Sequence, residues 1–240
     1  MDFFKRITAA AVSRLSAEAL AMALALAVLP VQNLHSCTIV TMAKDGQVLI
    51  GNNEDWTDPQ TKMWFYPAAK GEYGRVCFGF SKDFGFPQGG INDQGLFLDA
   101  NALPPTGWQP DPGKPPFDDS IVSINDYILA HCATVDDAIA FFSKYSVFLG
   151  GGKFVIADAR GGSIVVEWAN GSDRISRREG FYQISTNIPQ WNIVPGKVSD
   201  DRYTIAERVI LKRNEASLGA MRAVLSATHK EWSYPTIYSY

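Results

Sequence analysis

The chain has 240 residues and a formal net charge of −3, and no basic cluster stands out, so nucleic acid is not expected as a partner. Its three cysteines and three histidines have no zinc-site spacing, and phosphate-loop, dinucleotide and G-x-S-x-G motifs are absent, so no cofactor or metal is expected. Cys77 and Cys132 could form a disulfide in an oxidising compartment or stay as buried thiols, and the sequence leaves both readings open.

The first 36 residues have the pattern of a cleavable export signal. Three basic residues precede position 15, and residues 17–31 form an Ala/Leu-rich run that is too short to span a membrane. Cleavage after Ser36 would make Cys37 the N-terminus of a periplasmic or secreted protein without a membrane span. Residues 37–240 would then be a single domain, long enough to bury a substantial core.

Two other readings of this segment stay open. Glu18, inside the apolar run, fits an amphipathic helix that remains attached to the protein. Residues 34–37 (Leu-His-Ser-Cys) also fit a lipobox, although His is a poor residue at its third-last position. Lipidation of Cys37 would make the chain a lipoprotein or an anchored binding domain without enzymatic activity.

The mature chain is predicted to begin with a β-hairpin. Residues 37–43 are rich in β-branched side chains, residues 44–46 (Lys-Asp-Gly) are typical of a tight turn, and residues 47–53 form the second strand. Because a hairpin brings its two ends together, we expect Cys37 to lie close to Asp55. The sequence therefore predicts a thiol beside a carboxylate.

The rest of the chain alternates between blocks of strands and pairs of helices, an order that indicates two packed sheets with helices outside them. A proline-rich loop at 103–119 separates the first strands from the first helix pair. The final segment ends within a strand-like pattern, so one or two C-terminal strands could be missing. Strands are expected at 63–67, 73–80, 95–102, 153–158, 163–168, 174–177, 181–186 and 232–240, and helices at 120–132, 135–145, 200–213 and 216–227.

Five short motifs occur in a fairly specific order. They are residues 37–38 (Cys-Thr), 51–56 (Gly-Asn-Asn-Glu-Asp-Trp), 92–96 (Asn-Asp-Gln-Gly-Leu), 185–189 (Ser-Thr-Asn-Ile-Pro) and 199–203 (Ser-Asp-Asp-Arg-Tyr). Together they resemble the cysteine N-terminal-nucleophile hydrolases, in particular the choloylglycine hydrolase and penicillin V acylase family, which hydrolyse linear amide bonds.

The resemblance implies an α+β fold, a four-layer αββα sandwich with two antiparallel sheets flanked by helix pairs. It also implies Cys37 as the nucleophile after processing, Asp55 as the carboxylate that holds its free amine, Asn187 as an oxyanion donor and Arg202 as support for the nucleophile. Asn101 falls near another oxyanion or substrate position. The expected substrate is a small N-acylated molecule.

Two departures from the family pattern bear on the substrate. Asn52 stands where the family usually has Arg. The interval from Asn187 to Arg202 is short compared with the bile-salt enzymes, so a tetramer-forming insertion common there would be absent, and the oligomeric state is open. Both departures argue against conjugated bile salts as the preferred substrate.

Aromatic residues that follow the first hairpin could form an apolar pocket for the acyl group. Trp56 and Phe84 are the leading candidates for substrate contact. Four more aromatics could join them, and all six fit a plain core equally well; the four are Trp64, Phe65, Tyr66 and Phe86.

An N-terminal cysteine can supply a nucleophile and a base in one residue. Its thiol has an ordinary pKa of ~8.5 and its amine one of ~7.7–8.0, so the neutral amine can take the thiol proton and return it to the leaving amine. This chemistry predicts an exported amidase. An N-terminal-Cys dipeptidase, which shares the Asn-x-Glu-Asp opening, and an acyltransferase are the alternative enzymes.

Overall fold

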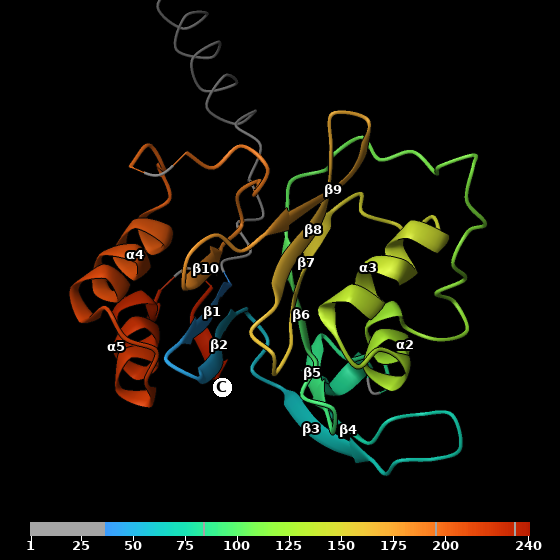
Figure 1. Ribbon diagram of the computed structural model, residues 1–240, viewed down its shortest axis with the longest axis horizontal. Helices are drawn as coiled ribbons and strands as arrows, with labels where there is room; N and C mark the ends of the chain where they lie inside the picture. The colour runs from blue at the N-terminus through green and yellow to red at the C-terminus, as the bar shows by residue number, and fades with distance from the viewer. Residues whose placement is uncertain (1–36, 84, 195, 233) are drawn as a thin grey trace, which may run out of the picture. The chain divides into compact units, whose positions relative to one another are not determined.

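The computed structural model describes residues 37–83, 85–194, 196–232 and 234–240. These residues form two antiparallel sheets, each with a pair of helices on its outer face (Figure 1). In this view α4 and α5 lie to the left, the sheets in the middle, and α2 and α3 to the right. The structure confirms the predicted α+β arrangement in four layers.

The smaller sheet has the strand order β10-β1-β2-β11. β1 and β2 form the predicted hairpin, and its turn residues Asp45 and Gly46 have φ values of 52° and 77°. These left-handed conformations are the ones that Asp-Gly hairpin turns favour. The four strands are β1 (Thr38–Lys44), β2 (Gln47–Asp55), β10 (Tyr182–Ser185) and β11 (Thr236–Ser239).

The larger sheet runs in chain order from β3 to β9. The sequence pattern does not predict β5, because the adjacent Gly89 and Gly90 are typical of a turn. A Cβ at Gly90 would lie 2.3 Å from the Val76 carbonyl oxygen, so glycine allows this strand to approach its neighbour. The seven strands are β3 (Thr61–Tyr66), β4 (Arg75–Phe80), β5 (Gly89–Asn92), β6 (Phe97–Ala102), β7 (Gly152–Ala157), β8 (Ser163–Ala169) and β9 (Ser172–Arg177).

The helices begin close to the predicted signals, except for α2, which is preceded by turns over residues 119–122 and is shorter than expected. α3 starts with a capping box, in which Thr134 accepts from the Asp137 N–H and the Asp137 carboxylate accepts from the Thr134 N–H. The helices are α2 (Ile124–His131), α3 (Val135–Lys144), α4 (Asp201–Arg213) and α5 (Leu218–Thr228), and a short 3₁₀ turn covers Ser81–Asp83.

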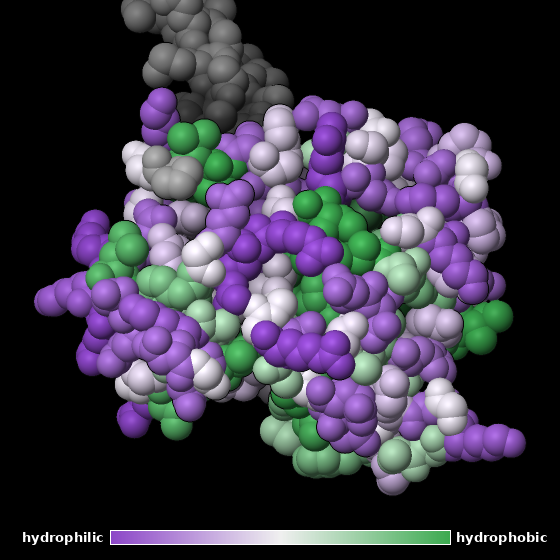
Figure 2. All heavy atoms as spheres, in the orientation of Figure 1, coloured by the Kyte–Doolittle hydropathy of each residue, from purple (hydrophilic) through white to green (hydrophobic). Residues whose placement is uncertain are grey.

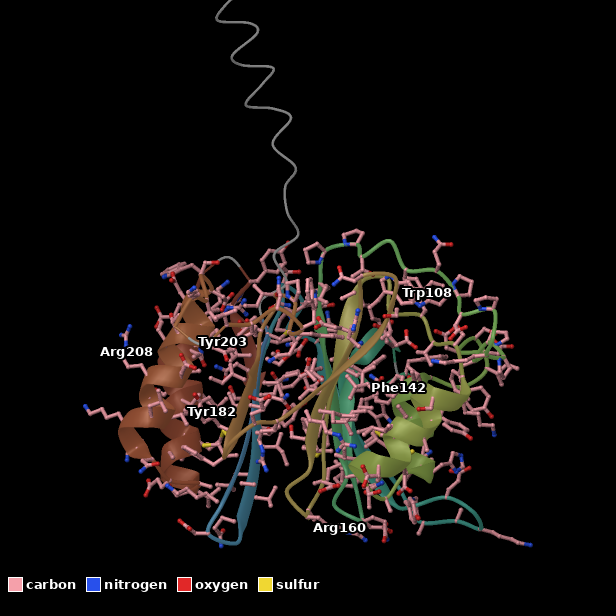
Figure 3. The ribbon with its side chains drawn as sticks, turned by 45° about the horizontal axis from the view of Figure 1, so that its top comes forward. Trp108, Phe142, Arg160, Tyr182, Tyr203 and Arg208 are labelled. Carbon is pink, nitrogen blue, oxygen red and sulfur yellow. The ribbon has the colours of Figure 1, made fainter. Side chains whose placement is uncertain are left out.

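Three hydrophobic clusters join the four layers. The largest packs α2 and α3 on the larger sheet, and the second packs α4 and α5 on the smaller sheet. Phe142 of α3 and Tyr203 of α4 point from their helices toward these sheets (Figure 3). A small cluster of buried apolar residues lies between the sheets and consists of Ile39, Phe97, Val155 and Val165. Hydrogen bonds between buried polar side chains also cross this layer, from Asn52 to Asp99 and from Ser185 to Asn101.

Cys77 and Cys132 are both buried and free, so the disulfide that the sequence left open is not formed.

Over the described ranges, no helix has the length and apolar character needed to cross a bilayer. Polar and charged residues cover most of the face seen in Figure 2, and apolar residues gather in smaller patches between them.

Candidate active site

A pocket of about 330 Å³ opens beside Cys37, between side chains of the two sheets. This volume lies at the lower end of the range found for small-molecule sites. Its lining residues are Cys37, Glu54, Trp56, Phe80, Lys82, Asp83, Gln88, Ala100, Asn101, Ala102, Gly151 and Gly152.

Cys37 lies directly before β1 and is 4% exposed. Arg202 Nη1 donates to its carbonyl oxygen at 2.8 Å, and the backbone N–H of Asp55 donates to its sulfur. Burial, reinforced by the negative charge of Glu54, raises the pKa of the thiol well above its ordinary value. The thiol is therefore neutral as it stands and needs a base to become a nucleophile.

Asp55 ends β2 and is fully buried. Its Oδ1 accepts from the Thr236 hydroxyl, and its Oδ2 has no hydrogen-bond partner among the residues that the structure describes. Burial raises the pKa of Asp55 to about 6, although the Thr236 hydrogen bond and the positive charge of Arg202 act in the opposite direction. A buried carboxylate with one free oxygen is a place where a cation would be stabilised.

Arg202 and Asn187 form a chain of hydrogen bonds between α4 and the larger sheet. Arg202 Nη1 donates to Asn187 Oδ1 at 3.0 Å, and Nη2 pairs with Asp200 at 2.9 Å. Asn187 Nδ2 in turn donates to the carbonyl oxygen of Ala102 at 2.8 Å. Because this bond uses one N–H of the amide, only the second N–H of Asn187 can serve a ligand.

Asn101 lines the Cys37 pocket from β6 and is fully buried. Its Oδ1 accepts from the Ser185 hydroxyl at 2.6 Å, which fixes the orientation of the amide. Its Nδ2 has no hydrogen-bond partner in the described part of the chain. A buried, unused donor beside the thiol makes Asn101 a better oxyanion candidate than Asn187.

The aromatic wall of the pocket is narrower than the sequence predicts. Trp56 lines the pocket together with Phe80, and their ring centroids are 5.4 Å apart. Phe84, the second predicted substrate contact, lies outside the described residues. Lys82 and Asp83 also line the pocket, so its wall is partly charged.

The other aromatic candidates do not line this pocket. Trp64 is buried in the larger core cluster, and Tyr66 packs against the same cluster. Phe65 and Phe86 are 67% and 47% exposed. Of the aromatic candidates within the described residues, Trp56 is the one that lines this pocket.

A cluster of buried polar side chains next to Cys37 is not predicted from the sequence. Asn52 Nδ2 donates to Asp99 Oδ2 at 2.7 Å and to Glu54 Oε2 at 3.3 Å, and the Tyr240 hydroxyl also donates to Asp99. Burial raises the pKa of Glu54 to about 7 and the pKa of Asp99 well above its ordinary value. Asn52, at the position where Arg was expected, bridges these carboxyl groups without adding a charge.

The two-residue repeat of side chains along a β-strand could have predicted this cluster from the sequence. Asn52 and Glu54 are two residues apart on β2, and Asp99 and Asn101 are two apart on β6. Residues two apart in a strand share one face of the sheet. Polar pairs at this spacing in strands that are otherwise buried indicate a polar layer between the sheets.

A second buried network holds the loop that carries Asn187. Lys153 Nζ donates to the Ile188 carbonyl oxygen at 2.7 Å and to Gln190 Oε1 at 3.3 Å, while Glu167 accepts from the Gln190 N–H at 2.9 Å. Both charged side chains are buried, and burial lowers the pKa of Lys153 to about 7. These contacts attach the loop to β7 and β8.

Residues 41–230 match the model of the acyl-coenzyme A:6-aminopenicillanic acid acyltransferase family. The chain belongs to this family. Membership confirms the predicted relation to the cysteine N-terminal-nucleophile hydrolases. It also confirms, at the level of the family, the predicted class of enzymes that act on linear amide bonds. A search of curated proteins gave no match.

Solved structures of an acylase and a hydrolase share the fold of this chain. Penicillin V acylase from Agrobacterium tumefaciens has a TM-score of 0.60 at 20% identity, over 80% of this chain and 71% of that one. Two variants of conjugated bile acid hydrolase from Clostridium perfringens have TM-scores of 0.62 and 0.61 at 15% identity. The matches cover 81% and 82% of this chain and 80% and 79% of the hydrolase chains.

Proposed function

We propose that this member of the family is an exported amidase that hydrolyses a linear amide bond of a small N-acylated molecule. Removal of residues 1–36 would make Cys37 the N-terminus and the nucleophile. The observation that carries the proposal is Asp55, whose buried Oδ2 has no partner within the described ranges. A free α-ammonium group on Cys37 would supply that partner, because β1 and β2 bring the two residues together.

In the reaction the Cys37 sulfur would bond to the amide carbon and the carbonyl oxygen would become an oxyanion. Asn101 Nδ2 and the second N–H of Asn187 are the side-chain donors proposed for this oxyanion. One such donor typically contributes ~2.7–4 kcal/mol to the transition state. Arg202 would act as a positioning residue, since it holds the Cys37 carbonyl oxygen rather than the substrate.

The α-amine is the proton acceptor that the sequence predicts. Its pairing with Asp55 would also favour the ammonium form, because a nearby negative charge stabilises a cation. A raised ammonium pKa leaves a smaller fraction of the amine in its neutral, proton-accepting form at neutral pH. A second proton acceptor beside the thiol would therefore complement the amine in this mechanism.

The proposed substrate carries a small apolar acyl part that packs on Trp56 and Phe80. Penicillin V and N-acyl amino compounds fit this description, and penicillin V acylase is one of the solved structures that share the fold. Conjugated bile salts are expected to be poor substrates, because the pocket is small and Asn52 replaces the usual Arg.

Acyl transfer is the second candidate, because the matching family is described by that reaction. An amine would then attack the same Cys37 thioester in place of water. A lipoprotein reading excludes both reactions, since lipidation of Cys37 would block the amine that Asp55 is proposed to hold.

The test uses protein produced in an exporting host and characterised by intact mass and N-terminal sequencing. We expect a free Cys37 N-terminus. A panel of penicillin V, N-acyl homoserine lactones, N-acyl amino acids and conjugated bile salts is then compared by kcat/KM, with and without an acceptor amine. We expect hydrolysis of the smaller N-acyl amides and none in Cys37→Ala, at an unchanged melting temperature. Activity of Cys37→Ala close to the parent contradicts the nucleophile, and a preference for bile salts contradicts the substrate alone.

A further inference from the structure

Cys37 and Glu54 stand opposite each other across the first hairpin. In the register of β1 and β2, Thr38 pairs with Asn53. One residue further, Cys37 is opposite Glu54, and such directly opposed residues have Cβ atoms about 4.5–5.5 Å apart on one face of the sheet. Asp55 is the next residue along β2, so its side chain points to the other face.

The contacts agree with this placement. The Glu54 carboxyl group lies beside the Cys37 thiol, whose pKa its negative charge raises, and both residues line the same pocket. Asp55 approaches Cys37 through its backbone N–H, while its carboxylate bonds Thr236. Two successive acidic residues therefore reach different ends of one cysteine: Glu54 reaches the thiol, and Asp55 is available to the amine.

We infer that Glu54 is a further catalytic residue, which takes the proton from the Cys37 thiol and delivers it to the leaving nitrogen. This inference rests on the proposed amidase function and adds Glu54 to the α-amine of Cys37 as a second proton acceptor beside the thiol.

Each step balances in protons and bonds. In acylation the S–H proton moves to the Glu54 carboxylate as sulfur bonds to the amide carbon. When the C–N bond breaks, that proton moves from Glu54 to the nitrogen, which leaves an amine and a Cys37 thioester. In deacylation water gives a proton to Glu54 and its oxygen bonds to the thioester carbon. The C–S bond then breaks as Glu54 returns the proton to sulfur, and a carboxylic acid leaves.

Of the two neighbouring carboxyl groups, Asp99 and Glu54, Glu54 has fewer hydrogen bonds and is therefore better able to exchange a proton. Asp99 accepts three hydrogen bonds, from Asn52, from the Tyr240 hydroxyl and from the Ala100 N–H at 2.7 Å. Glu54 accepts a longer hydrogen bond from Asn52, at 3.3 Å. Burial also raises the pKa of Glu54 to about 7, which suits a group that both takes and gives a proton at neutral pH.

Other ionisable groups share this environment and will contribute to any pH profile. Opposite charges and like charges both surround the thiol, so a profile of the parent protein alone does not assign Glu54. The groups that face Cys37 or Glu54 are Asp55 on β2, Asp99 on β6, Tyr238 and Tyr240 near the end of the chain, Lys82 and Asp83 at the pocket, Arg202 on α4 and Lys230 after α5.

The decisive experiment compares two properties of Glu54→Gln in the mature protein. The first is hydrolysis of the best substrate, for which kcat should fall ~10²–10⁴-fold while KM changes little. The second is alkylation of Cys37 by iodoacetamide, followed by the mass of the peptide that carries it. Alkylation should shift to lower pH, because the substitution removes a negative charge that opposes the thiolate. Glu179→Gln, the same change at an exposed position, should alter neither property.

A purely structural role for Glu54 would not increase thiol reactivity while hydrolysis falls. Unchanged kcat in Glu54→Gln, or a parallel loss of hydrolysis and alkylation, overturns the inference. Glu54→Asp keeps the carboxyl group and should recover part of kcat, so it also serves as the test if Glu54→Gln does not fold. A Glu54→Asp variant with no activity overturns the inference as well. A parent protein that hydrolyses no N-acyl amide contradicts the proposed function, and the alkylation measurement still tests the contact of Glu54 with the thiol.

Discussion

The guanidinium group of Arg202 donates to the carbonyl oxygen of Cys37 at 2.8 Å, across a separation of 165 residues. Arg202 lies in the first turn of α4, where the N-cap Asp200 accepts from the Tyr203 N–H and also pairs with the guanidinium. The start of the helix therefore sets the position of the arginine. Packing of α4 on the smaller sheet thereby holds the backbone of the candidate nucleophile.

Arg202→Lys should lower kcat by ~10–100-fold, the range that corresponds to losing a charged hydrogen bond of about 1.5–3 kcal/mol. Lysine keeps the charge but cannot reproduce the fork that bonds Cys37, Asn187 and Asp200 together. Steady-state kinetics measures the effect. Arg208→Lys is the matched control, because Arg208 is an exposed residue on the outer side of α4 (Figure 3). Equal kinetics in the two variants would show that Arg202 has no positioning role.

Asn101→Ala should reduce kcat by ~10²–10³-fold with a small change in KM, as expected for loss of an oxyanion donor. Asn187→Ala should cost less, because one Asn187 N–H already bonds the Ala102 carbonyl oxygen. Both variants are compared with the parent on the best substrate. A larger loss in Asn187→Ala, with Asn101→Ala near the parent rate, would reverse the assignment.

The free energy of unfolding should fall as pH rises between about 4.5 and 7. Burial raises the folded-state pKa of Glu54 from 4.5 to about 7, so the folded state binds this proton more tightly than the unfolded chain. The stabilisation is complete below the unfolded pKa and is lost as pH rises through the folded pKa, by on the order of 3 kcal/mol. Urea unfolding at several pH values measures it. Glu54→Gln should make the curve shallower, and the remaining slope comes from Asp55 and Asp99, whose pKa values burial also raises. Glu179→Gln should follow the parent; parallel curves for all three would refute the prediction.

Gly89→Ala should destabilise the fold by about 1–3 kcal/mol, the usual cost of overpacking, and should reduce activity. A Cβ at Gly89 would lie 2.8 Å from both the Leu98 carbonyl oxygen and Asp99 Cγ, so it would displace the carboxyl group that neighbours Glu54. Thermal unfolding and kcat provide the readouts. Gly219→Ala is the control, since its Cβ would meet nothing closer than 3.7 Å at an exposed helical position. The prediction fails if the two alanine variants have equal stability.

Lys153→Met should lower both kcat/KM and the free energy of unfolding. Removing one partner of a buried charged network typically costs about 3–5 kcal/mol, because the charge of the buried Glu167 is left uncompensated. The substitution removes the contacts with Ile188 and Gln190 that fix the loop carrying Asn187. Chemical denaturation and kinetics are measured on the same preparation. A variant that keeps full activity would show that the loop does not depend on Lys153.

Local sequence patterns predict those elements whose structure is determined by residues close to one another along the chain. The Asp45-Gly46 turn specifies the first hairpin, and the Thr134–Asp137 spacing specifies the start of α3. Both signals lie within a few residues, so tertiary packing does not override them. The approach of Cys37 to Asp55 follows from the hairpin alone.

Contacts between the sheets are not visible in such patterns. The Asn52–Asp99 hydrogen bond joins residues 47 positions apart, and the Lys153–Ile188 bond joins residues 35 apart. Burial of these charged groups depends on how the two sheets stack. For the same reason the sequence favours Asn187 as the oxyanion donor, whereas the unused amide nitrogen belongs to Asn101.

The hairpin of β1 and β2 also affects the order in which the site can assemble. Hairpins form in about 1–10 μs, whereas contacts between distant segments must first overcome the entropy of closing a long loop. Cys37 can therefore meet Glu54 and Asp55 early in folding, while Arg202 arrives only when α4 docks. A chain that has formed the hairpin alone would have a thiol and its carboxylates but no oxyanion donor. Amide hydrolysis would thus begin only when the last long-range contacts of the fold are complete, although its nucleophile is in place much earlier.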